Sequence, residues 1–147
     1  MTTPIRLFAV LLLLVGCDGS DPGPVDDGIP GPADAFVGDW EGSGWYESES
    51  DAKGDMSWDI AGGVTISRLS STAVTVDSRN LAGYGCGTVI YDVSADWHGK
   101  LRSGQSCFVT DLSLKDDVLT LFGIAGDGQL MQPTTYSESV TMKRVPK

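Results

Sequence analysis

Apolar and polar residues alternate over short stretches along most of the chain, and from residue 36 onward they show no sustained helical period. A period of two places successive side chains on opposite faces of a β-strand. The pattern predicts about eight strands, at residues 37–48, 56–69, 72–79, 87–95, 97–102, 107–114, 118–124 and 137–145. Segments rich in Gly, Asp, Asn and Ser, which favour turns, separate them.

Short strands joined by tight turns indicate an all-β fold with antiparallel neighbours. Closing such a sheet removes its free edges, which otherwise invite pairing with other chains. We therefore expect a small antiparallel up-and-down barrel over residues 36–147, with a β-sandwich as the alternative. A chain of 147 residues has room for one such domain and short accessory segments.

The N-terminal segment has a different character. Arg6 precedes an uninterrupted apolar run over residues 7–15, which has the length of a signal-peptide core and is shorter than the ~20 residues that span a bilayer. The run ends in Leu14-Val15-Gly16-Cys17, which resembles the lipobox of bacterial lipoproteins. The resemblance implies that residues 1–16 are a cleaved signal peptide and that Cys17 carries the lipid. The alternative is an ordinary signal peptide that leaves a cysteine nearby.

Residues 17–35 are rich in Pro, Gly and Asp and poor in apolar side chains. Such a segment cannot bury enough apolar area to offset the entropy lost on ordering, so it predicts a disordered tether. Its aspartates also raise the possibility of a calcium loop. However, Asp18, Ser20 and Pro22 break the ligand alternation of an EF-hand, and no glutamate closes the loop.

The three cysteines are interpreted together. If Cys17 is acylated, Cys86 and Cys107 remain as a pair in an exported chain, where disulfides persist. Their disulfide closes a loop of roughly 20 residues, which is worth about 3 kcal/mol in the chain-entropy model. The alternative is two buried free thiols.

The first predicted strand opens with Gly38-Asp39-Trp40, which resembles the Gly-x-Trp opening of lipocalin-like, or calycin, barrels. In that superfamily the tryptophan plugs the closed end of the barrel, and a basic residue from the last strand packs across it. The resemblance implies a barrel-closing pair of Trp40 and Arg144. Independently, the period of two places Tyr46 on the same face as Trp40 and Trp45 on the opposite face. The alternative is that Trp40 is a core aromatic residue of another β-sandwich.

The layout of the whole chain adds a second resemblance. A lipobox, a low-complexity tether, an early Gly-x-Trp and a late Gly104-Gln105-Ser106-Cys107 are similar to the layout of uncharacterised myxobacterial lipoproteins. The likeness implies a lipid-anchored protein of the bacterial cell envelope and brings no activity with it. Asp18 after the anchor is an inner-membrane retention signal in enteric bacteria, but the rule does not transfer between lineages, so inner and outer membrane both stay open.

Charge and composition limit the chemistry. The formal net charge is -10, and so acidic a chain repels nucleic acid and anionic headgroups, which leaves the N-terminal lipid as the membrane contact. His98 is the only histidine, and no Gly-x-Ser-x-Gly motif is present. Scattered carboxylates around one histidine make no zinc motif. We therefore expect no catalytic residues, no metal site and no cofactor.

The expected role is non-enzymatic binding of a small apolar ligand or an envelope component. This hypothesis needs space in the barrel, which Trp40, Tyr46, Trp58 and Met142 could instead fill. The alternative is a protein-interaction module, such as an inhibitor of a lytic enzyme. It would present the outward Trp45 and the acidic face to a basic envelope protein.

Overall fold

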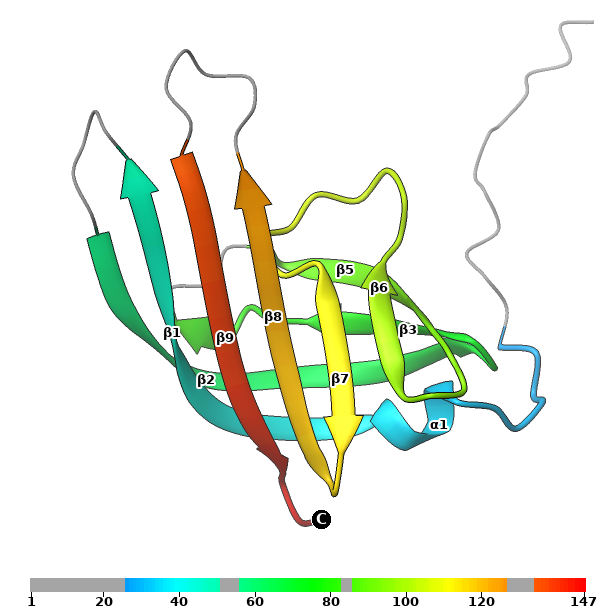
Figure 1. Cartoon of the computed structure of the whole chain (residues 1–147). Coiled ribbons are helices and arrows are strands. Elements are labelled where there is room, and N and C mark those ends of the chain that lie inside the picture. Colours follow the sequence, from blue (N-terminus) through cyan, green and yellow to red (C-terminus); the bar gives the residue numbers. More distant parts are fainter. Residues whose placement is uncertain (1–25, 51–55, 83–85, 127–133) are drawn as a thin grey trace, which may run out of the picture.

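The computed structural model describes residues 26–50, 56–82, 86–126 and 134–147. Within these ranges the chain is almost entirely β-structure, with one short helix before the first strand (Figure 1). The elements are α1 (Ala33–Phe36), β1 (Gly38–Ser50), β2 (Met56–Ser70), β3 (Ala73–Asp77), β4 (Leu81–Ala82), β5 (Thr88–Val93), β6 (His98–Leu101), β7 (Asp111–Lys115), β8 (Val118–Gly126) and β9 (Thr134–Arg144).

The strands form one closed antiparallel barrel. Their order is β1-β9-β8-β7-β6-β5-β3-β2, and β1 also pairs with β2, which joins the two edges of the sheet. The short β4 is an extra strand beside β2. The predicted all-β barrel of eight antiparallel strands is therefore confirmed, and the sandwich alternative is wrong.

Most observed strand ends lie within one to three residues of the predicted ones, and two differences are larger. The strand predicted at residues 107–114 begins only at Asp111, so the prediction is wrong for residues 107–110. The two-residue β4 was not predicted, because its pattern is too short to show a period.

The core follows the period of two along each strand. In β1, Trp40 is fully buried and Tyr46 is 5% exposed, while Trp45 between them is 42% exposed. Facing strands contribute apolar side chains that are wholly buried: Ile60, Val74, Tyr91, Leu112, Leu119, Leu121, Val140 and Met142. Burying each large side chain of this kind stabilises the fold by roughly 1.5–3 kcal/mol. The end of the barrel near α1 is thus densely filled.

Two glycines let β1 approach β9 closely where the barrel closes. A Cβ added at Gly42 would lie 2.0 Å from the carbonyl oxygen of Thr141, and one at Gly44 would lie 1.9 Å from that of Ser139. No side chain fits at either separation without backbone movement. Gly42 and Gly44 therefore permit the tight curvature that joins the first and last strands.

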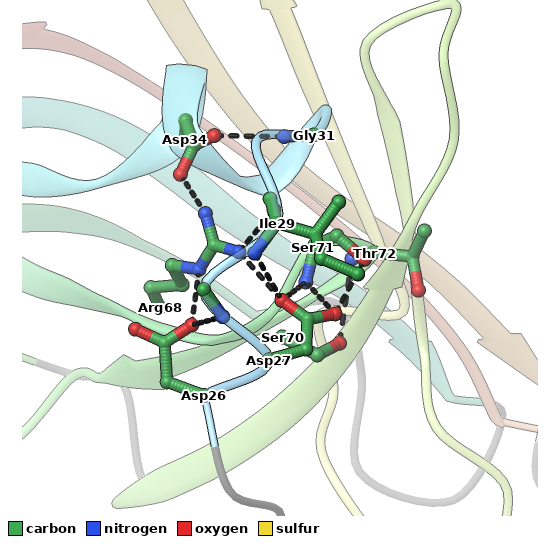
Figure 2. Close-up of polar contacts among 10 residues, drawn as sticks. Asp26, Asp27, Ile29, Gly31, Asp34, Arg68, Ser70, Ser71 and Thr72 are labelled. Atoms are coloured by element: carbon green, nitrogen blue, oxygen red, sulfur yellow. Dashed lines mark hydrogen bonds and ion pairs between the residues drawn. The ribbon is translucent and has the colours of Figure 1, made fainter.

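The segment before α1 is fixed to the barrel. We call residues 26–34, which run into the first turn of α1, the strap. Figure 2 shows the guanidinium of Arg68, on β2, surrounded by carboxylates from this part of the chain. It lies 2.7 Å from Asp26 and 2.7 Å from Asp27, and it also bonds Asp34 and the carbonyl of Ile29.

A second set of contacts holds the strap to the turn between β2 and β3. The hydroxyl of Ser71 donates to Asp27 at 2.7 Å, and its N–H donates to the same carboxylate at 3.0 Å. The N–H of Ala33 donates to the carbonyl of Ser71 at 3.1 Å, and Ala33 is fully buried. The strap is therefore held by both charge and packing.

This arrangement corrects part of the predicted tether. Over residues 26–35 the chain is docked rather than free, because its aspartates meet Arg68, a partner far along the sequence. Composition alone does not reveal such a partner. Residues 17–25 of the predicted tether, and the predicted signal peptide at residues 1–16, lie outside the described residues.

The carboxyl groups of Asp27 and Asp34, which take part in holding the strap, have lowered pKa values. Hydrogen bonds from Ser71 hold the pKa of Asp27 below its ordinary value of 3.8, with a smaller contribution from Arg68. The N–H of Gly31, followed by Arg68, lowers the pKa of Asp34. A carboxyl whose pKa falls on folding stabilises the folded state above the unfolded pKa, and this contribution is lost as pH falls through the folded pKa.

We predict that acid releases the strap. It should be fully docked above about pH 5, and its docking should weaken progressively as the pH falls below 3.8 toward the lowered pKa values of Asp27 and Asp34. Hydrogen exchange at the amides of Ser71 and Ala33 measures this, because both N–H groups bond within the docked arrangement.

Arg68→Met tests the same contact at neutral pH. Methionine keeps an apolar stem but removes the charge, so these amides should exchange faster at pH 7. Arg102→Met is the matched control, because Arg102 pairs with Asp92 elsewhere on the surface. Equal protection in both variants would show that Arg68 does not hold the strap.

Candidate functional site

The structure brings Trp40 and Arg144 together at the end of the barrel next to α1, which we call the closed end. The guanidinium carbon of Arg144 lies 4.2 Å from the centroid of the Trp40 ring, a cation–π geometry. Arg144 also donates to the carbonyls of Ala35, at 2.6 Å, and Val37, while the Trp40 indole N–H donates to Phe36 at 2.9 Å. Because Trp40 is fully buried, its ring closes the barrel and offers no surface to a ligand.

Cys86 and Cys107 are joined by a disulfide, with their Cα atoms 5.2 Å apart. The bond ties the segment before β5 to residues 102–110, which connect β6 and β7 and which we call the crossing loop. Closing this part of the chain stabilises the fold by about 3 kcal/mol in the chain-entropy model. The disulfide therefore fixes the position of the crossing loop.

The crossing loop runs against the inner face of β8. Val109 is fully buried, and its carbonyl accepts a hydrogen bond from the Tyr91 hydroxyl at 2.9 Å. A Cβ added at Gly123 would lie 2.0 Å from the carbonyl oxygen of Phe108, so the loop backbone lies directly on β8. The loop thus fills part of the barrel interior and places Phe108 at the end farther from α1.

An aromatic cluster stands at that end. Tyr46 on β1 and Trp58 on β2 are register partners, and their rings stack with centroids 4.0 Å apart and an interplanar angle of 18°. Phe108 meets Tyr46 edge-on at 6.3 Å. We call Tyr46, Trp58 and Phe108 the aromatic mouth. Trp58 is 40% exposed and Phe108 49% exposed, so the cluster presents apolar surface to solvent.

The position of the mouth follows from the β1–β2 hairpin. Both strands run from the closed end to the opposite end of the barrel, as Figure 1 shows. Trp58 shares a face with the fully buried Ile60, two residues on, and therefore faces inward. Met56, one inward position nearer the tip, is 46% exposed. The mouth is thus an open, apolar continuation of the core.

One polar side chain accompanies the mouth. Ser48 lies two residues beyond Tyr46 on the same face of β1 and is 2% exposed. Its hydroxyl has no hydrogen-bond partner among the described residues. Buried polar atoms are paired in the large majority of cases, so this hydroxyl is unusual.

The outer face of the β1–β2 pair carries a different surface. An open groove of about 700 Å³ is lined by the acidic Asp39 and Glu41 together with Gly62, Gly63, Thr65 and Asn80. Asp39 accepts a hydrogen bond from the Thr65 hydroxyl at 2.8 Å. Trp45 lies on the same outward face of β1 and is 42% exposed, as the period of two predicted.

The structure also places the other residues that the sequence singled out. His98 is exposed on β6, opposite Ser113 on β7. Among the described residues, no three His, Cys, Asp or Glu side chains gather in a way that could hold a metal ion. Cys17 and its motif lie outside the described residues.

Sequence reasoning identified only part of the mouth. The sequence marks Tyr46 and Trp58 as side chains that could fill the interior, and Tyr46 is indeed 5% exposed, but Trp58 remains 40% exposed because it lies beyond the filled core. Phe108 lies in the strand that the sequence predicts at residues 107–114, but β7 begins only at Asp111. A possible signal was its position directly after Cys107, since a disulfide fixes the backbone beside it.

Comparison with protein-family models, curated proteins and solved structures finds no match to this chain. The structure itself defines the class as a closed eight-stranded antiparallel barrel with one extra strand. No helix within the described ranges is long and apolar enough to cross a membrane.

We predict that Gly123→Ala destabilises the protein far more than Gly99→Ala. At Gly123 the new methyl meets a backbone carbonyl, whereas at Gly99 its nearest neighbours are side-chain atoms of Leu112 and Val93, at 3.1–3.2 Å. Overpacking of a rigid site costs about 1–3 kcal/mol, so urea unfolding should show a loss of that order for the first variant. Equal stability of the two variants would mean that the crossing loop does not lie on β8.

Proposed function

We propose that this protein is a lipid-anchored lipoprotein of the bacterial cell envelope whose barrel binds a small apolar ligand, or an apolar part of an envelope component, at the aromatic mouth. The binding role is non-enzymatic. The observation that carries the proposal is the stacked Tyr46–Trp58 pair, which stands preformed at the mouth with Trp58 40% exposed.

The geometry supports a shallow site for a flat molecule. Ile60, Leu121 and Val140 are fully buried below the mouth, so a ligand would lie on the aromatic rings rather than deep in the barrel. Aromatic pairs contribute about 0.5–1.5 kcal/mol beyond the burial of their area. Because Tyr46 and Phe108 brace each other edge-on, little ordering would be needed on binding.

A calycin-like barrel is part of this proposal. The contact between Arg144 and the Trp40 ring is the one that the Gly-x-Trp resemblance implies. Because Trp40, Arg144 and α1 block the closed end, we expect a ligand to enter the barrel at the mouth. The ligand-binding proposal depends on the aromatic mouth and does not require the chain to be related to the calycin barrels.

Attachment through Cys17 has its own test. Cells grown with an alkyne analogue of palmitate should label the wild-type protein, whereas Cys17→Ala should remain unlabelled and leave the membrane fraction. A protein carrying both Cys86→Ala and Cys107→Ala is the control and should still be labelled. Labelling of the Cys17→Ala protein would show that the lipid is attached at another residue and would contradict an N-terminal anchor at Cys17.

We predict that Trp58→Ala weakens ligand binding and Trp45→Ala does not. The two indoles are similarly exposed, at 40% and 42%, but only Trp58 faces inward. Binding of N-phenyl-1-naphthylamine to the exported Cys17→Ala chain, which carries no lipid, is followed by the rise in probe fluorescence. Loss of one stacking face should weaken binding about tenfold.

The opposite outcome would favour a second candidate function. The acidic groove beside Asp39 and Glu41, with Trp45 on the same face, fits an interaction module for a basic protein such as a lytic enzyme. In that case Trp45→Ala would weaken partner binding and Trp58→Ala would leave it unchanged. Absence of probe binding to the wild-type barrel would contradict the ligand proposal directly.

A further inference from the structure

We infer that the ligand of the aromatic mouth is amphipathic, and that the Ser48 hydroxyl selects it by bonding a neutral polar group. This inference rests on the proposed function and goes beyond it, because it names the chemical class of the ligand and a residue that determines specificity.

The position of Ser48 makes it part of the mouth. Tyr46 pairs with Trp58, and Ser48 pairs with Met56, so Ser48 is the next inward position toward the hairpin tip. Inward neighbours on one strand are separated by about 6.6–6.8 Å, and diagonal neighbours across a strand pair by about 7–8 Å. Two fused rings stacked on Trp58 would therefore place one substituent at this distance from Ser48, and because the hydroxyl is buried in the free protein, the contact requires the side chains that cover it to move aside.

The burial of Ser48 is the second step of the argument. A serine hydroxyl offers one donor and two acceptor sites. At 2% exposure it has lost contact with bulk water, and it has no hydrogen-bond partner among the described residues. Leaving a buried hydroxyl unpaired is unfavourable, and alanine would fill nearly the same volume without that penalty. A polar group on a bound ligand supplies the missing partner.

The same reasoning limits the chemistry of that group. Burying an ion costs far more than one hydrogen bond to a hydroxyl returns, so a neutral hydroxyl, carbonyl or amide is favoured over a carboxylate or an ammonium group. Because Ser48 is nearer the hairpin tip than Tyr46, the polar group lies toward the rim and the apolar rings lie toward the core. The ligand class is thus a small, flat, apolar molecule with one uncharged polar group.

Two probes of similar shape test the inference. The exported Cys17→Ala chain is loaded with N-phenyl-1-naphthylamine, which is then displaced by 1-naphthol or by 1-methylnaphthalene. For each protein variant we compare the ratio of the dissociation constants of 1-naphthol and 1-methylnaphthalene. The two probes differ in hydrophobicity by the same amount in every variant, so this difference cancels when the ratios are compared. Ser48→Ala should shift this ratio against 1-naphthol by about fivefold to tenfold. Ser43→Ala, on the exposed outward face of the same strand, should leave it unchanged.

Stability without a probe separates a ligand-selecting role from a structural one. If the hydroxyl is unpaired in the free protein, Ser48→Ala should unfold at the same temperature as the wild type or higher. A lower unfolding temperature would show that the hydroxyl bonds within the protein and would overturn the inference. If both probes displace the dye and their ratio is unchanged in Ser48→Ala, the inference about Ser48 is overturned while the proposed function stands. If the fluorescent probe does not bind the wild-type protein, both the inference and the proposed function are overturned.

Discussion

The double pairing of β1, with β9 on one side and β2 on the other, is the constraint on which the molecule depends. It turns an open meander into a barrel, and it is possible because Gly42 and Gly44 leave room for the backbone of β9. The same strand carries Trp40 at the closed end and Tyr46 and Ser48 at the mouth. One strand therefore sets both the closure of the barrel and the geometry of its open end.

Much of this architecture could be predicted because it follows from local sequence patterns. The alternation of apolar residues fixes the inward face of each strand, so the burial of Trp40 and the exposure of Trp45 follow from parity. The disulfide partners could be found by counting cysteines, and Cys86 and Cys107 do lie at bonding distance. The Trp40–Arg144 contact needed a family resemblance, because no local pattern joins residues so far apart in the sequence.

What the sequence did not reveal depends on pairings between distant segments. The aspartates of the strap belong to a composition typical of disorder, and only the fold brings Arg68 to them from β2. Residues 107–110 have the alternation of a strand, yet the disulfide and the bond between Tyr91 and Val109 hold them across the interior. The period of two places Ser48 on the inward face, but it does not reveal that its hydroxyl has no hydrogen-bond partner among the described residues, which is a property of the surroundings.

The strap also determines how the barrel responds to mechanical load. A pull on the chain N-terminal to residue 26 acts first on the ion pairs around Arg68, on β2, and not on the hydrogen bonds of β1. The load therefore enters the barrel beside its closed end, while the mouth, at the far end of the β1–β2 hairpin, stays outside the path of force (Figure 1). A force applied to the chain at this point would therefore leave the aromatic mouth undistorted.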